Sequence, residues 1–164
     1  MKHKVLKCYV VMVSRHFIQK HKRKGEETGF IEKIGSGEKI HTIRGNFDYW
    51  DKRIDKVQKG EAYISLRYWE GKPYNSDQIE FKRLYKEDGV GIEMIKFKNS
   101  EPYIFENLEG CDTVKFGVVA STKYLANKDG LSSDDFEEWF NDYDTSKPMA
   151  IIHFTPFRYL DMFK

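Results

Sequence analysis

The chain has 164 residues, of which 40% are hydrophobic, 33% charged and 15% aromatic. The length predicts one domain over residues 1–164, and the aromatic content excludes a disordered chain. No apolar run approaches the ~20 residues of a membrane span. Only two cysteines occur, Cys8 and Cys111, so no disulfide framework is expected. We expect a cytoplasmic protein without cofactor or membrane partner.

The net charge of +2 is unevenly distributed along the chain. Residues 1–44 contain eleven Lys or Arg and four Asp or Glu, whereas residues 101–146 contain three and eleven. A basic segment of this kind can bind a polyanion. Alternatively, the two segments face each other or lie on solvated surfaces.

β-Branched and aromatic residues predict about seven short strands. In chain order they are Val5–Val13, Ile40–Arg44, Glu61–Trp69, Gln78–Tyr85, Val90–Phe97, Thr113–Ala120 and Met149–Phe154. The short turn at Asp88-Gly89 predicts that the strands on either side of it form a hairpin.

Three helices are predicted between these strands. The first covers Thr28–Ile34 and the second Phe47–Lys59, with Gly35 and Gly60 as stop signals. The third begins at Ser132, a typical N-cap residue. Together the elements predict an α+β domain, a small, closed or nearly closed β-barrel of about six or seven strands flanked by about three helices.

The most distinctive stretch is Gly37–Arg44, which reads G-E-K-I-H-T-I-R. On a regular strand Thr42 and Arg44 point to one face, while His41 points to the other and is expected to be a core or interface histidine. Lys39 lies at the preceding turn. An ammonium, a hydroxyl and a guanidinium that converge suit a phosphate or a nucleobase edge. The alternative is an edge strand whose polar side chains face water.

This stretch resembles the G-x-K-x-x-T-x-R signature of ASCH domains, which belong to the PUA-like superfamily. The resemblance implies a small barrel with a cleft beside the motif, and binding of RNA or nucleotides. Some small bacterial ASCH proteins are amidohydrolases that deacetylate N4-acetylcytidine. In those enzymes the signature lysine and threonine act with a glutamate that precedes a late helix.

Carried over to this chain, the lysine matches Lys39, the threonine matches Thr42, and Asp129 stands where the family has glutamate. The aspartate is one methylene shorter, and a misplacement of ~1 Å can cost ~100-fold in rate.

Three functions therefore follow as expectations. The first is binding of RNA or a modified nucleoside in a cleft lined by Lys39, Thr42 and Arg44. The second is hydrolysis of N4-acylated cytidine by Lys39, Thr42 and Asp129. The third is an accessory domain that binds a protein partner.

A second candidate surface is the basic run of residues 20–24. Its cations, Lys20, Lys22, Arg23 and Lys24, are typical of a loop that contacts RNA phosphates, although a solvated loop has the same composition. His16 and His21 lie five residues apart, a spacing that suits neither a helical nor a strand metal site. No metal is therefore expected, and the sequence does not indicate an oligomeric state.

Overall fold

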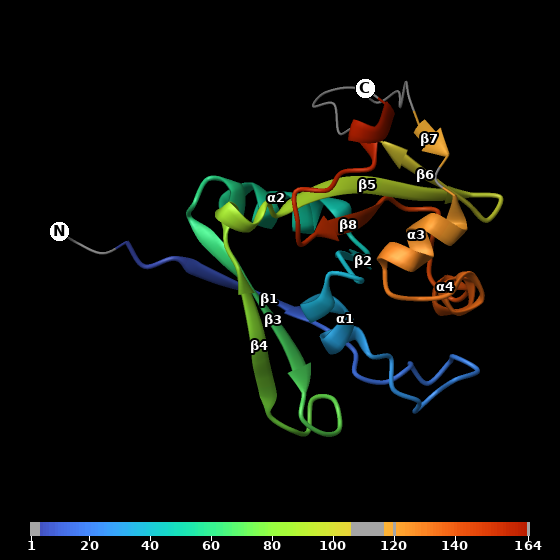
Figure 1. Ribbon diagram of the computed structural model, residues 1–164, viewed down its shortest axis with the longest axis horizontal. Coiled ribbons are helices and arrows are strands. Elements are labelled where there is room, and N and C mark those ends of the chain that lie inside the picture. Colours follow the sequence, from blue (N-terminus) through green and yellow to red (C-terminus); the bar gives the residue numbers. More distant parts are fainter. Residues whose placement is uncertain (1–3, 106–116, 120, 164) are drawn as a thin grey trace.

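The computed structural model describes residues 4–105, 117–119 and 121–163, and it has an α+β fold (Figure 1). The strands are β1 (Lys7–Met12), β2 (His41–Arg44), β3 (Ala62–Trp69), β4 (Gln78–Leu84), β5 (Gly91–Lys98), β6 (Glu101–Phe105), β7 (Gly117–Val119) and β8 (Met149–His153). The helices are α1 (Phe30–Ser36), α2 (Phe47–Gln58), α3 (Thr122–Lys128) and α4 (Ser133–Phe140), with single 3-10 turns η1 (Lys86–Asp88) and η2 (Leu160–Phe163).

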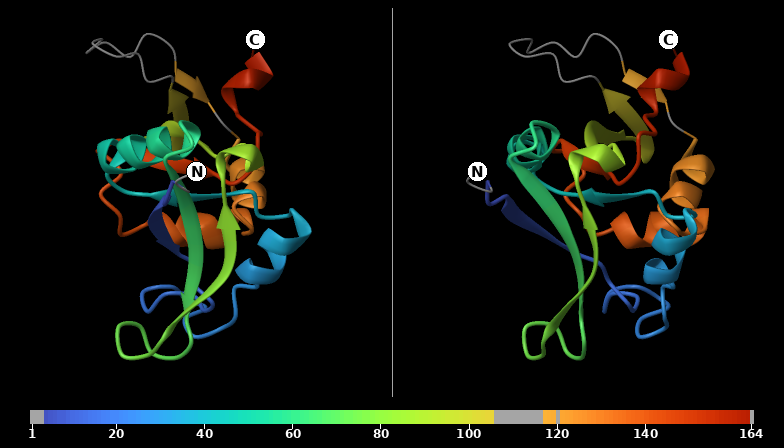
Figure 2. Two further views of the ribbon diagram at one scale, coloured as in Figure 1. Left: turned by 90° about the vertical axis from the view of Figure 1, so that its left-hand side faces the viewer. Right: turned by 60° about the vertical axis from the view of Figure 1, so that its left-hand side comes forward.

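The strands form two sheets. One has the order β1-β3-β4, with β1 parallel to β3, and the other has the antiparallel order β2-β8-β5-β6-β7. Figure 2 shows the three-stranded sheet projecting away from the five-stranded one. In the part of the chain that the structure describes, the two sheets do not close into a barrel. The α+β prediction is thus confirmed, whereas the predicted barrel is not seen.

The predicted hairpin at Asp88-Gly89 is wrong. Strand β4 pairs with β3, while β5 pairs with β6 and β8 in the other sheet. Gly89, with φ 83°, ends η1, and a Cβ on Gly91 would lie only 1.9 Å from the Arg158 guanidinium. Because the chain is packed this tightly against the C-terminal segment, the turn leads into a second sheet and does not reverse the strand.

Two elements were missed by the sequence analysis, strand β6 and helix α3. Strand β6 follows β5 through Asn99 and Ser100, which both have positive φ, as a two-residue hairpin requires. Cys111 lies outside the described residues, as do residues 113–116 and 120 of a predicted strand whose remainder is β7.

The predicted helices are present with shifted ends. Helix α1 begins two residues later than predicted because Gly29 is left-handed, and Gly37, at φ 81°, ends it in place of Gly35. In α4 the Ser132 hydroxyl accepts the Asp135 N–H, which confirms the predicted cap. No helix in the described ranges has the length and apolar character that crossing a membrane requires.

Strand β8 lies between β2 and β5 in the five-stranded sheet, and its five residues are all buried. Helix α1, which leads into β2, lies beside the turn between α3 and α4 (Figure 1). Main-chain hydrogen bonds join these segments, from Ile40 N–H to the Lys128 carbonyl and from Phe154 N–H to the Ile40 carbonyl. The start of β2 is therefore held between α1, the α3–α4 turn and β8.

Candidate functional site

The residues of the G-x-K-x-x-T-x-R motif are positioned by the end of α1. Gly37 turns the chain, and the Lys39 N–H then donates to the Lys33 carbonyl over 3.0 Å. The neighbouring bond from Ile40 to Lys128 places Lys39 directly opposite Asp129, the residue that follows α3. Two residues 90 positions apart in the chain thus meet at one point.

Lys39 and Asp129 form a buried ion pair. The Lys39 Nζ donates to Asp129 Oδ1 over 2.9 Å and to the Asp129 main-chain oxygen over 2.7 Å. The two residues are only 3% and 4% exposed, and the Phe30 ring centroid lies 4.3 Å from Nζ. The aspartate therefore reaches the lysine despite being shorter than the glutamate of the family pattern.

The surroundings shift the pKa of both partners. Burial lowers the pKa of Lys39; the charge of Asp129 opposes this, and the charges of Arg44 and Lys33 add to it. Burial alone would raise the pKa of Asp129, but the Lys39 charge and the hydrogen bonds from His41 and Lys39 hold it below its ordinary value. An ionised carboxylate thus holds a lysine that gives up its proton more readily than usual.

His41 joins this pair. Its Nδ1 lies 3.2 Å from Asp129 Oδ1, and its Nε2 lies 2.7 Å from the Tyr159 hydroxyl. The residue is completely buried, and burial lowers its pKa. The core position predicted for His41 is confirmed, but the sequence analysis missed that the ring contacts a candidate catalytic carboxylate.

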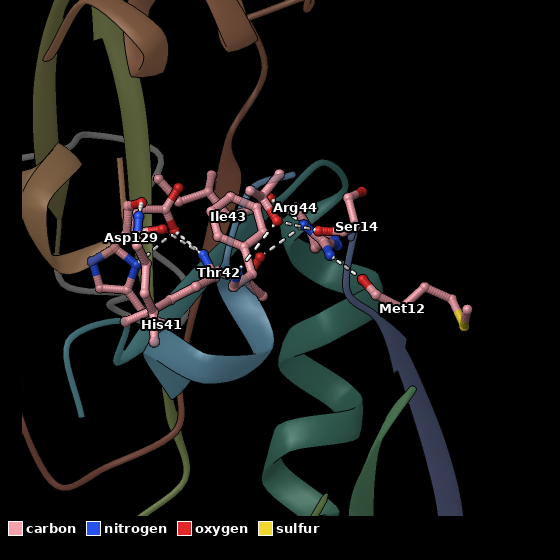
Figure 3. Close-up of polar contacts among 12 residues, drawn as sticks. Met12, Ser14, His41, Thr42, Ile43, Arg44 and Asp129 are labelled. Atoms are coloured by element: carbon pink, nitrogen blue, oxygen red, sulfur yellow. Dashed lines mark hydrogen bonds and ion pairs between the residues drawn. The ribbon is translucent and has the colours of Figure 1, made fainter. Parts of the chain in front are cut away.

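Thr42 and Arg44 lie on the other face of β2. Arg44 donates to the Thr42 hydroxyl over 2.8 Å, to the Ile43 carbonyl over 3.1 Å and to the Met12 carbonyl at the end of β1 (Figure 3). Burial lowers the pKa of Arg44. The guanidinium therefore ties the two sheets together while it holds the Thr42 hydroxyl in place.

The predicted convergence of Lys39, Thr42 and Arg44 is only partial. Figure 3 shows Thr42 between the Asp129–His41 contact and Arg44. Among the described contacts no hydrogen bond joins Lys39 to Thr42 or Arg44. Strand alternation explains the division, because residues 39 and 41 share one parity and residues 42 and 44 the other.

The basic run packs against acidic residues of α4 and of the turn that follows it. Lys20 lies 3.9 Å from Asp142, Lys22 lies 3.7 Å from Glu138, and the Arg23 guanidinium lies 2.6 Å from Asp135. Lys24 is exposed, and no ion pair of its side chain occurs within the described ranges. The basic and acidic segments thus face each other, so a phosphate that binds here competes with carboxylates of this chain.

The histidines do not gather into a metal site. His16 is exposed, whereas His21 is buried with its Nε2 3.1 Å from the Asp135 carbonyl. Over the residues that the structure describes, no group of three His, Cys, Asp or Glu side chains is placed to hold a metal ion.

A groove of about 430 Å³ adjoins the α3–α4 turn, and neither Lys39 nor Asp129 is among the residues that line it. It lies between the segment of residues 17–29 and the α3–α4 turn, and Arg23, Lys33 and Gly130 are among the residues that line it. A Cβ on Gly130 would lie 3.2 Å from the Lys39 Cβ. Gly130 thus lines the groove and also packs against the Lys39 side chain. The Lys33 ammonium, which donates to the Gly130 carbonyl over 2.8 Å, flanks the same point.

A further polar cluster, missed by the sequence analysis, supports the Tyr159 end of the site. Glu93 Oε1 accepts from His153 Nε2 over 2.7 Å and from the Tyr159 N–H over 2.8 Å. One signal was available: Glu93 falls on the same alternating face of its strand as the fully buried Ile95. The pairing of His41 with His153 across β2 and β8 shows only in the structure.

Comparisons with models of protein families, with curated proteins and with solved structures gave no match to this chain. The ASCH resemblance therefore depends on the motif at residues 37–44 and stays a prediction.

Proposed function

We propose that the protein is an amidohydrolase that removes the acyl group from N4-acylated cytidine. The observation that carries this proposal is the buried contact of 2.9 Å between Lys39 and Asp129. These residues match the lysine and, with aspartate for glutamate, the acid of the family pattern. The sequence raised one objection, that aspartate is one methylene shorter than glutamate. The contact answers it, because the shorter carboxylate still reaches the lysine.

The chemistry assigns one role to each residue. Asp129 orients Lys39, whose lowered pKa makes the ammonium easier to deprotonate, and the neutral amine then acts as general base. The amine takes a proton from water, the water oxygen attacks the acyl carbon, and the developing oxyanion accepts hydrogen bonds from Thr42 and Arg44. The bond from the acyl carbon to N4 then breaks, and Lys39 returns the proton to N4, which yields cytidine and a carboxylic acid.

The test is incubation of the purified protein with N4-acetylcytidine, followed by chromatography for cytidine. Lys39→Met removes the ammonium and keeps most of the side-chain volume, while Lys56→Ala removes an exposed lysine on α2 as a matched control. We expect the wild type and Lys56→Ala to release cytidine, and Lys39→Met to lose about 100-fold in rate. Release by folded Lys39→Met at the wild-type rate would contradict the role of the lysine.

The second candidate is binding of RNA or a modified nucleoside without turnover. The exposed cations Lys20, Lys22 and Lys24 favour it, as do Arg23 and Lys33, which line the groove together with Glu27 and Asp135. Here we expect wild-type protein to release no cytidine and to bind short RNAs with an affinity that falls steeply from low to high salt. An affinity that salt leaves unchanged would count against phosphate contacts, and no affinity at all would favour a protein partner.

The ASCH resemblance supports both candidates equally. The PUA-like barrel that it implies does not support either, because the described strands form two separate sheets.

A further inference from the structure

We infer that His41 and Tyr159 are positioning residues that act through Asp129 to orient Lys39. Four side chains form one continuous line of hydrogen bonds, from Tyr159 through His41 and Asp129 to Lys39. Neither His41 nor Tyr159 belongs to the G-x-K-x-x-T-x-R pattern, in which His41 occupies an unspecified position. The inference builds on the proposed hydrolysis but concerns residues that the proposal does not use.

The direction of each hydrogen bond follows from the chemistry of its partners. An ionised carboxylate only accepts, so His41 Nδ1 carries the proton that is donated to Asp129 Oδ1. A neutral imidazole then leaves Nε2 as an acceptor, and the Tyr159 hydroxyl donates to it over 2.7 Å. Asp129 Oδ1 therefore receives two donors, His41 Nδ1–H and the Lys39 ammonium.

Burial makes this arrangement specific. The four residues are between 0% and 4% exposed, so water does not replace a missing donor easily. Burial raises the pKa of the Tyr159 hydroxyl, so this group keeps its proton and remains a donor. Because only one tautomer of His41 satisfies both neighbours, the line of hydrogen bonds holds the Asp129 carboxylate in one orientation toward Lys39.

A second set of contacts fixes the position of Tyr159. Glu93 accepts the main-chain N–H groups of Tyr159 and Leu160 over 2.8 and 3.0 Å, and His153 Nε2 donates to the same carboxylate. Glu93 and His153 lie on β5 and β8, two neighbouring strands of the five-stranded sheet. The Tyr159 hydroxyl is thus aimed at His41 by rigid elements.

The other charged groups near these side chains do not replace His41. The charges of Lys33 and Arg44 lower the pKa of Lys39. The charge of Glu93 raises the pKa of His41, and Tyr124 and Glu93 raise the pKa of Tyr159. In the described part of the chain, the side chains that donate to the Asp129 carboxylate are Lys39 and His41. Loss of the His41 donor therefore raises the pKa of Asp129, and the carboxylate is protonated at a higher pH.

The first experiment compares kinetic pH profiles of Tyr159→Phe and Tyr124→Phe, each of which removes one phenolic hydroxyl. We expect Tyr159→Phe to lose about 10-fold in kcat with KM unchanged, with its acidic limb shifted to higher pH. Tyr124→Phe, whose ring lies 6.1 Å from Tyr159, keeps the wild-type profile. His41→Asn retains a donor toward Asp129 and is expected to fall between wild type and His41→Phe.

The second experiment needs no turnover and separates this inference from the proposed hydrolysis. In ¹⁵N NMR spectra of histidine-labelled protein, we expect His41 to carry its proton on Nδ1, and Tyr159→Phe to give a mixture of tautomers. This result supports the arrangement even if the wild type releases no cytidine. A wild-type His41 protonated on Nε2, or an active His41→Phe with an unshifted acidic limb and native stability, would overturn it.

Discussion

Two regions of the molecule contain paired charges, and they differ in access to water. Beside the α3–α4 turn, Lys39 and Asp129 are almost fully buried. On the surface, the side chains of Lys20 and Asp142 are 73% and 57% exposed. Water weakens charge interactions at the surface, whereas in a dry interior a charge without its partner is costly. The same chemical pair is therefore expected to matter for stability where it is buried and to contribute little where water surrounds it.

The largest effect is expected from breaking the buried pair. Lys39→Ala or Asp129→Ala leaves one buried charge without its partner and should lower the free energy of unfolding by about 3–5 kcal/mol. The double variant Lys39→Met, Asp129→Leu should be more stable than either single variant. Urea denaturation checks both results, and a loss below about 1 kcal/mol in the single variants would refute the importance of the pair.

A somewhat smaller effect is expected from His153, whose pKa burial lowers to about 4. An unfolded histidine titrates near 6.5, so the unfolded chain binds a proton first as the pH falls. Stability is therefore fully present above about pH 6.5 and declines by about 3 kcal/mol towards pH 4.

The control for this decline is His153→Gln, which keeps a donor toward Glu93 but does not titrate. Denaturation at several pH values should show a flatter profile for the variant between pH 6.5 and 4. A wild-type profile with the same slope as the variant would exclude His153 as the source.

The smallest effect is expected at the surface. Removing Lys20 and Lys22 together should leave the midpoint of urea denaturation unchanged, because solvent and salt screen their pairs with Asp142 and Glu138. The same double variant should weaken any RNA binding, so the RNA affinity falls while the stability stays unchanged. A large loss of stability would mean that the basic run holds α4 in place.

Part of the site was predicted, from the local alternation of strand residues and from the family resemblance. Strand alternation already separates Thr42 and Arg44 from His41, and the family resemblance pointed to Asp129 as the partner of Lys39. Tyr159 was not predicted, because its contact with His41 joins residues 118 positions apart. Nothing in the local pattern of either residue indicates that contact.

The fold shows the same division. Most strands and the three predicted helices were found because alternation, caps and glycine stops are local signals. The pairing of the strands was not predicted. Gly91 packs against Arg158, and the turn after β4 therefore leads into a different sheet. The barrel was an inference from strand number, and strand number does not specify how sheets close.

The most direct test of the central claim, that the buried Lys39–Asp129 pair is a reactive site, is cytidine release from N4-acetylcytidine by wild type, Asp129→Asn and Asp129→Glu. Asparagine keeps the shape but removes the charge, whereas glutamate restores the acid of the family pattern. The account predicts release by the wild type, a loss of about 100-fold in Asp129→Asn and measurable release by Asp129→Glu. Equal rates in the wild type and a folded Asp129→Asn would contradict it.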